Sequence, residues 1–325
     1  MQSSTSGSAL RKSVVEHPLD ADDGTIVDAM RTTTISRKGL LRGIEAREPF
    51  DALMESVLPR DDVSFESAVV GGIPGLWVHP ALSVSVNSIL HLHAGWFSLG
   101  TAKAFRHLVG HIAARTRVSA FIPDYRLAPE HPFPAAVDDV LACYRGLGEM
   151  GIRRIALTGD SAGGNLALVL ASRVANEDIS AKSKLVGVAA LSPVTDLTLT
   201  AATYETRAVA DPYFTRPQVA ELVRSYLGST DAKNPLASPL YGQLAKLPPI
   251  RIHVGDDEVL LDDSRRYIEQ AIAAGVDARL DVWMGMPHGF AGSVGTLKAS
   301  TQALDAIGIF LTKALQTGLS TRPAK

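Results

Sequence analysis

Short apolar segments alternate with longer amphipathic segments from about residue 75 onward, and this alternation restricts the fold more than any other feature of the sequence. The apolar segments are rich in Val, Ile, Leu and Ala, as expected for strands buried on both faces. The intervening segments have helical spacing; in 101–116, for example, Phe105, Leu108 and Ile112 share one face. The expected strands are 75–80, 88–93, 118–125, 154–159, 184–194, 249–255 and 278–284. The pattern predicts an α/β fold with a mostly parallel central sheet and helices on both faces.

Two segments do not follow this alternation. Residues 1–60 are polar, weakly periodic and favour helix, and residues 195–235 interrupt the pattern after "LSPVTD". We expect both to lie over the sheet, the first as an N-terminal cap segment and the second as a contribution to the lid, with 61–325 as the main domain. Because sites in parallel sheets form in loops at the carboxyl ends of the strands, such a lid would cover the site.

Composition and charge exclude several classes of protein. Of the 325 residues, 46% are hydrophobic and 20% are charged, and the net charge of −2 gives no footprint for nucleic acid or an anionic membrane. Cys143 is the only cysteine, so no disulfide forms within the chain. The polar N-terminus lacks the apolar core of a secretory signal, and no apolar run reaches the ~20 residues that span a membrane. We therefore expect a cytoplasmic protein without nucleic-acid or membrane partners.

The stretch "RIALTGDSAGGNLALVLAS" contains a serine where a predicted strand meets a predicted helix. Gly159-Asp160-Ser161-Ala162-Gly163 fits the pattern G-x-S-x-G in the context that this pattern requires. A serine in such a strained turn projects its hydroxyl from the sheet edge, and its neighbours two residues away must be small. The start of a helix also favours developing negative charge. We interpret Ser161 as a candidate nucleophile rather than as a capping serine.

A serine hydroxyl needs a base that removes its proton. The chain has nine histidines, and His288 in "WMGMPHGF" follows a predicted strand and lies in a turn, where an imidazole can reach the sheet edge. We expect packing or surface roles for the others. His91 and His93 share one strand face, but no third ligand is evident nearby, so no metal site is predicted.

The base in turn needs an acid between the serine and the histidine in the chain. The stretch "HVGDDEVLLDD" follows the predicted strand 249–255 and offers five carboxylates. Those of Asp262 and Asp263 suit the first turn of the next helix, whereas Asp256, Asp257 and Glu258 lie in the turn itself. The residues alone leave this choice open.

Four motifs follow one another along the chain: "DYRLAPEHPFPAA", "GDSAGGNLAL", "VGDDEVLLDD" and "MPHGF". With these motifs, the chain from about residue 70 to its end resembles the bacterial branch of the hormone-sensitive lipase family of α/β-hydrolase esterases. The resemblance implies an α/β-hydrolase fold with a helical cap, a catalytic domain over 61–325, a Ser-His-acid triad, and neither cofactor nor metal. Members of this family often dimerise, so a homodimer is a further expectation.

The resemblance also implies which acid is used. The family's pattern D-P-L-x-D falls on Glu258-Val259-Leu260-Leu261-Asp262, which makes Glu258 the triad acid. Asp257 is the runner-up, because adjacent turn residues differ only in the direction in which they point.

The family's H-G-G-G-[FY] motif reads His93-Ala94-Gly95-Trp96-Phe97 here. In relatives, backbone N–H groups of this motif and of the residue after the serine bind the oxyanion, which implies Gly95, Trp96 and Ala162. Ala94 stands where relatives have glycine, and a positive φ there would cost about 1–2 kcal/mol. We expect structural roles for His93 and for the "DYRLAPE" residues.

These expectations combine into a carboxylesterase that acts on small, uncharged, short-acyl esters through an acyl-enzyme. Trp96, Phe97, Tyr213 and Phe214 are candidates for the apolar walls of the substrate site. A lactone hydrolase or an amidase would use the same triad and remains an alternative. A non-catalytic small-molecule receptor on a hydrolase scaffold is a further alternative, which the presence of both Ser161 and His288 disfavours.

Overall fold

The computed structural model describes residues 13–83, 86–177, 179 and 182–316, and these residues form one nine-stranded sheet. The strand order is β1-β9-β8-β7-β6-β4-β5-β3-β2. All neighbours from β1 to β5 pair in parallel, whereas β3 pairs antiparallel with both β5 and β2. The strands are β1 (Val14–His17), β2 (Val63–Val70), β3 (Ile73–Pro80), β4 (Asn87–Leu92), β5 (Ala120–Pro123), β6 (Arg154–Asp160), β7 (Lys184–Leu191), β8 (Ile250–Gly255) and β9 (Ala278–Trp283). The predicted α/β fold is confirmed.

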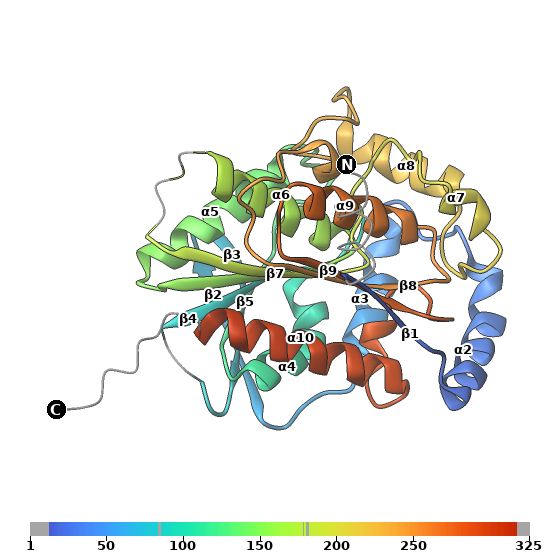
Figure 1. The fold of residues 1–325 in the computed structure, drawn as a ribbon, viewed down its shortest axis with the longest axis horizontal. Coiled ribbons are helices and arrows are strands. Elements are labelled where there is room, and N and C mark those ends of the chain that lie inside the picture. Colours follow the sequence, from blue (N-terminus) through green and yellow to red (C-terminus); the bar gives the residue numbers. More distant parts are fainter. Residues whose placement is uncertain (1–12, 84–85, 178, 180–181, 317–325) are drawn as a thin grey trace, which may run out of the picture.

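Helices cover both faces of the sheet (Figure 1). Helices α5, α6 and α9 lie on one face, and α4 and α10 lie on the other. The helices are α2 (Ala21–Thr34), α3 (Arg47–Glu55), α4 (Ala102–Thr116), α5 (Ala135–Glu149), α6 (Ala162–Asn176), α7 (Thr203–Thr206), α8 (Arg216–Leu227), α9 (Leu261–Ala273) and α10 (Lys298–Gln316), with short 3-10 helices at Ile35–Arg37, Ile44–Ala46, Pro239–Tyr241 and Phe290–Gly292. Within the described ranges, every helix falls short of the combined length and hydropathy that a membrane span requires.

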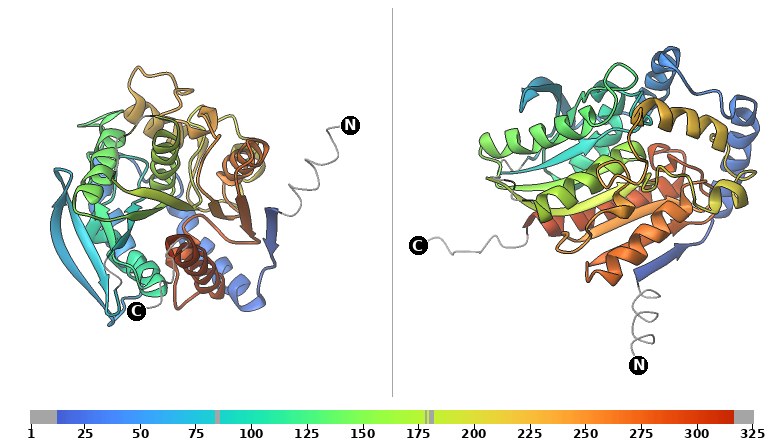
Figure 2. Two further views of the ribbon diagram at one scale, coloured as in Figure 1. Left: turned by 60° about the vertical axis from the view of Figure 1, so that its left-hand side comes forward. Right: turned by 90° about the horizontal axis from the view of Figure 1, so that it is seen from above.

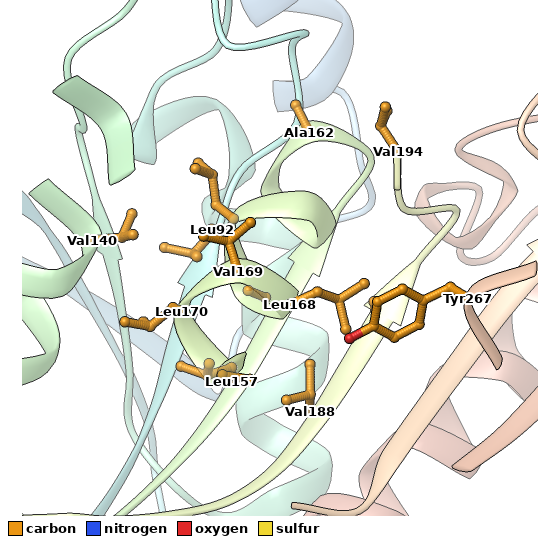
Figure 3. Close-up of a cluster of buried hydrophobic side chains, with 14 of the residues drawn as sticks. Leu92, Val140, Leu157, Ala162, Leu168, Val169, Leu170, Val188, Val194 and Tyr267 are labelled. Carbon is orange, nitrogen blue, oxygen red and sulfur yellow. The ribbon is translucent and has the colours of Figure 1, made fainter. Parts of the chain in front are cut away.

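Helix α6 is the centre of the larger core. All of its residues from Ala162 to Ala171 are buried. Figure 3 shows Leu168, Val169 and Leu170 of this helix among apolar side chains from the strands and neighbouring helices. Burial of a side chain of this size contributes roughly 1.5–3 kcal/mol, so the helix is fixed firmly on the sheet. The turn that precedes it is therefore held on a rigid support.

The N-terminal segment differs from the expectation, because part of it joins the sheet. Residues Val14–His17 pair in parallel with β9, from Val14 opposite Leu280 to His17 opposite Trp283 (Figure 2). The His17 ring stacks on Trp283 at 3.9 Å between centroids. The predicted cap segment 1–60 thus contributes an edge strand. Only four residues form it, too few for a detectable periodicity.

A second strand was not predicted. β2 runs next to β3 as the outermost hairpin strand, and most of its side chains are exposed, so its sequence lacks an apolar run. Gly71 and Gly72 form the connection with φ of 61° and 83°. A Cβ on Gly71 would lie 2.0 Å from the carbonyl oxygen of Ala142, which explains why glycine is required there.

The remaining cap helices gather at one end of the sheet. Figure 1 shows α2, α7 and α8 together on its right-hand side. Gln218 Nε2 on α8 donates to the carbonyl oxygen of Leu41 at 2.7 Å, and Arg42 forms an ion pair with Glu221 at 3.0 Å. The N-terminal segment and the segment 195–235 are therefore bonded to each other, although more than 150 residues separate them in the chain.

Candidate active site

Ser161 occupies the sharp turn between β6 and α6. Its φ of 56° and ψ of −114° lie outside the regions that non-glycine residues favour. The small neighbours are required by contact: a Cβ on Gly159 would lie 2.2 Å from the carbonyl oxygen of Gly163, and a Cβ on Gly163 would lie 1.9 Å from that of Leu92. The serine N–H donates to the carbonyl oxygen of Leu191 at 2.8 Å, which ties the turn to β7. This geometry is that of a nucleophile elbow.

The loop after β4 approaches the same turn. Gly95, Trp96 and Phe97 have φ of 121°, 51° and 61°. Ala94 is not among the residues with positive φ, so the expected strain at Ala94 is absent and lies instead at Trp96 and Phe97. A Cβ on Gly95 would lie 2.2 Å from the carbonyl oxygen of Leu99. The loop is thus folded tightly on itself.

Three backbone N–H groups of this region have no internal acceptor. Those of Gly95, Trp96 and Ala162 donate no hydrogen bond within the part of the chain that the structure describes. Ala162 is the first residue of α6, where backbone N–H groups lack helical acceptors and favour negative charge. These N–H groups can donate hydrogen bonds to an anionic oxygen at the start of the helix.

The turn after β8 and the loop after β9 are bonded to each other. The Asp257 N–H donates to the carbonyl oxygen of Met286 at 3.2 Å. A Cβ on Gly255 would lie 2.1 Å from that same oxygen, so glycine permits the close approach of the two loops. This contact brings Glu258 and His288 together at the carboxyl ends of adjacent strands.

Glu258 holds the His288 imidazole directly. Nδ1 of His288 donates to Oε2 of Glu258 at 2.7 Å, since a carboxylate can only accept. The other oxygen, Oε1, accepts from the Ser192 hydroxyl and from the Gly255 N–H, both at 2.7 Å. The Glu258 side chain is fully buried, and each of its oxygens has a partner. Sequence reasoning missed Ser192, for which "LSPVTD" gives no signal.

Electrostatics couple this pair to the serine turn. Burial alone lowers the pKa of His288, but the charge and hydrogen bond of Glu258 outweigh burial and raise that pKa above the usual 6.5. Burial also raises the pKa of Asp160, the residue before Ser161, to about 6, while the charge of His288 acts in the opposite direction. The charges of His288 and Asp160 thus shift each other's pKa, His288 lowering that of Asp160 and Asp160 raising that of His288.

The runner-up acid points elsewhere. The Asp257 carboxylate is bonded to the guanidinium of Arg31 on α2, and Asp256 faces Arg207 at 3.5 Å. Both aspartates therefore contact the cap segments, and Glu258 alone of the three turn carboxylates contacts His288.

Asp211 ties the segment before α8 to this turn. One oxygen of its buried carboxylate accepts from the N–H groups of Tyr213 and Phe214 at 2.8 and 2.9 Å, and the other accepts from the Val259 N–H at 2.9 Å. Sequence reasoning did not single out this residue, because its partners lie on two distant segments. It fixes Phe214 relative to the residue that follows Glu258.

One of the four predicted wall residues, Phe214, lies against the imidazole, and a second, Trp96, packs on Phe214. The Phe214 ring contacts the His288 ring edge-on at 5.0 Å and the Trp96 ring at 5.5 Å. Phe97 instead stacks on Tyr226 at 3.8 Å and is buried in the core, so its side chain supports the loop. Tyr213 lies beside Phe214, at 6.4 Å between ring centroids.

The residues expected to be scaffold make structural contacts. Nδ1 of His93 donates to the Ala94 carbonyl oxygen at 2.8 Å, and its ring stacks on Tyr125 at 4.1 Å. Arg126 pairs with Asp139, and Glu130 pairs with Arg47 of α3. Across the described residues, no group of three or more His, Cys, Asp or Glu side chains is arranged to hold a metal ion.

Comparisons with known proteins agree with this geometry. The family model described as alpha/beta hydrolase fold matches residues 89–292. An acetyl-hydrolase from Streptomyces hygroscopicus is 35% identical over 84% of this chain and 89% of its own length. An esterase from Acinetobacter venetianus is 35% identical over 69% of this chain and 74% of its own.

Solved structures of esterases superpose on this chain over most of its length. An esterase from the bacterial hormone-sensitive lipase family superposes with a TM-score of 0.84 at 34% identity, covering 92% of this chain and all of its own. An esterase/lipase from an uncultured bacterium superposes with a TM-score of 0.84 at 33% identity, over 91% and 99% of the two chains. The chain therefore belongs to the α/β-hydrolase fold family and, within it, to the bacterial hormone-sensitive lipase branch of carboxylesterases.

Proposed function

We propose that this enzyme hydrolyses small carboxylic esters with Ser161 as nucleophile, His288 as general base and acid, and Glu258 as the acid that orients the base. The contact of 2.7 Å between Glu258 Oε2 and His288 Nδ1 supports this assignment most strongly. It places the ring proton on Nδ1 and leaves the lone pair on Nε2, which is the tautomer that a base requires.

In the proposed reaction, Nε2 takes the proton of the serine hydroxyl while Oγ attacks the ester carbonyl carbon. The tetrahedral intermediate collapses, the C–O bond to the alcohol breaks, and His288 returns its proton to the departing alcohol. Water, deprotonated by the same nitrogen, then attacks the acyl carbon; the bond to Ser161 Oγ breaks, His288 returns the proton to Oγ, and the carboxylic acid leaves. The charge of Glu258 stabilises the imidazolium in both halves.

The oxyanion of each intermediate would be bound by the N–H groups of Gly95, Trp96 and Ala162. Their lack of internal acceptors supports this role. Loss of one such donor typically lowers the rate ~100- to 1000-fold. A backbone donor needs no particular side chain, so alanine and tryptophan in place of glycine are compatible with the chemistry.

A short acyl chain is the proposed substrate preference. Phe214 lies edge-on to the imidazole, Trp96 packs edge-to-face on Phe214, and both are nearly fully buried. A large ring against the imidazole, supported by a second ring, would limit the length of acyl chain that fits.

We further propose that residues 18–60 and 195–235 act together as a cap over the site, with the remainder as the catalytic domain. The two segments are bonded to each other, and each also forms an ion pair with the turn 256–258; these contacts support the division. The cytoplasmic location and the homodimer expected from the sequence stay predictions.

An ester panel with the wild type and Ser161→Ala tests the proposal. The wild type should hydrolyse p-nitrophenyl acetate faster than p-nitrophenyl octanoate or a δ-lactone, and Ser161→Ala should lose at least about 10,000-fold in rate. Ser172→Ala, on the same helix but bonded to the carbonyl oxygen of Gln243, is the matched control and should keep full activity.

Three results would contradict the proposal. Residual activity of Ser161→Ala near the wild-type level would exclude the serine mechanism. Preferred turnover of the lactone would change the substrate class. Saturable binding of a small ligand by well-folded protein without any turnover would support the receptor alternative.

A further inference from the structure

A cavity of about 600 Å³ lies at the end of the sheet opposite Ser161. Its floor includes Arg154 and Lys184, the first residues of β6 and β7, which face each other in register. β6 is seven residues long, so at ~3.3 Å per residue about 20 Å separates the two sites. Figure 1 shows the end of α10, which also lines the cavity, on the side of the sheet away from α2 and α7. This cavity is therefore separate from the candidate active site.

The lining is strongly cationic in a chain whose net charge is negative. It contains five basic residues and one carboxylate, Asp277; the basic residues are Arg154, Lys184, Lys246, Arg251 and Lys313. Asp277 forms an ion pair with Arg251 at 3.0 Å. Cations collected around one concave surface attract anions.

A structural role accounts for only part of this charge. Helices α6 and α10 end at the cavity, and each helix end carries roughly half a negative charge, which cations stabilise. Arg154 serves α10 in this way, because it donates to the carbonyl oxygen of Ala314 at 2.8 Å. Its Nε is buried and has no hydrogen-bond partner among the residues that the structure describes. Lys184 and Lys246 form no ion pair or side-chain hydrogen bond with the described residues.

The rest of the wall is apolar. Val174, Leu185, Val186, Pro249 and Phe310 contribute to it. The Arg251 guanidinium lies over the Phe310 ring at 4.8 Å, so charge and apolar surface are in direct contact. A ligand that fills this cavity needs an anionic head for the lysines and an apolar body for the wall.

We propose that this cavity binds a small amphipathic organic anion, with a carboxylate or phosphate head at Lys184, Lys246 and Arg154 and an apolar tail against Phe310. The head would supply a counterion to Lys184 and Lys246. The tail would cover apolar surface that is otherwise open to water.

Calorimetric titration of the full chain tests the proposal with four probes: octanoate, octyl phosphate, inorganic phosphate and 1-octanol. Octanoate or octyl phosphate should bind one molecule per chain, and the relative affinity of these two identifies the head group. Inorganic phosphate and 1-octanol should each bind at least about tenfold more weakly, because each lacks one half of the ligand.

Two variants assign the binding to this cavity. Lys184→Gln/Lys246→Gln should weaken binding at least about tenfold without changing hydrolysis of p-nitrophenyl acetate or the melting temperature. Lys103→Gln, at an exposed position of α4, is the control and should bind like the wild type. Equal binding by the double variant, equal binding of 1-octanol, or no saturable binding at millimolar concentrations would overturn the proposal, and none of these results bears on Ser161.

Discussion

At the scale of single residues, backbone strain is concentrated at the site. Among the described non-glycine residues, Trp96, Phe97, Ser161 and Ser192 all have positive φ. Such conformations cost of order 1–3 kcal/mol each and persist only where the surroundings enforce them. In this esterase they lie in the loop after β4, at the candidate nucleophile Ser161 and at Ser192, whose hydroxyl bonds to Glu258.

Trp96→Gly should change the acyl-chain specificity of the enzyme and lower its stability. Glycine relieves about 1 kcal/mol of strain, but loss of a buried ring costs about 3–5 kcal/mol, so we expect a net loss of stability of about 2–4 kcal/mol in denaturant unfolding. The vacated space beside Phe214 should raise the octanoate-to-acetate ratio of kcat/KM. Arg117→Gly, at an exposed residue with φ of 56°, is the control: it should gain stability and keep the wild-type ratio, and an unchanged ratio in Trp96→Gly would contradict the proposed wall.

Glu258→Gln should change the pH dependence of hydrolysis. Only neutral His288 acts as base, so kcat/KM rises as pH rises through its pKa, which Glu258 holds up. Removing this charge lowers the pKa, so the acidic limb should move to lower pH while the plateau falls about 1,000-fold or more. Asp257→Asn is the matched control. A shift of its acidic limb as large as that of Glu258→Gln would contradict the assignment of Glu258 as the triad acid.

At the scale of elements, one buried carboxylate joins two segments. Asp211 bonds the residues before α8 to the turn that contains Glu258. Asp211 receives two N–H groups from the segment before α8 and one from Val259. The carbonyl oxygen of Asp211 also accepts from Lys38, so three distant segments meet at this residue. Its position explains how a lid residue, Phe214, comes to lie against His288.

Asp211→Asn should therefore act on the site without touching substrate. The amide cannot accept at all three N–H groups, so we expect kcat to fall about 10- to 100-fold, with a smaller change in KM. Asp211 also helps to hold up the pKa of His288, so the acidic limb should move to lower pH. Asp231→Asn is the control, because the Asp231 carboxylate also accepts a backbone N–H but lies in an exposed turn. It should change neither kcat nor the acidic limb. A lower melting temperature without a shifted limb would show a purely structural role.

At the scale of the whole molecule, β1 forms one edge of the sheet and covers β9. It pairs with β9, which would otherwise present unpaired backbone groups to solvent. His17 reinforces the pairing, because it stacks on Trp283 and bonds to Asp281 at 2.8 Å.

Deletion of residues 1–19 should lower the melting temperature by several degrees and promote self-association, as measured by light scattering. His17→Ala, which leaves β1 in place, should lower the melting temperature less and leave the oligomeric state unchanged. A truncated chain with the wild-type melting temperature and mass would show that β1 contributes little to the fold.

The sequence by itself determined the features that depend on local sterics and periodicity. Alternating apolar runs specify buried parallel strands, and the glycines around Ser161 specify a sharp turn that larger residues cannot form. Chain order then favoured His288, in the loop after the last strand, as the candidate base. These are properties of neighbouring residues, so they can be read without the fold.

Only the tertiary structure decided the direction of side chains and the partners of short segments. Glu258 rather than Asp257 reaches His288 because Arg31, 226 residues away, binds Asp257. Strain lies at Trp96 rather than at Ala94 because the loop folds back on Leu99. β1 is a strand because β9 offers an open edge, not because its four residues have a marked pattern. Contacts between residues far apart in the chain set these outcomes, and local sequence does not encode them.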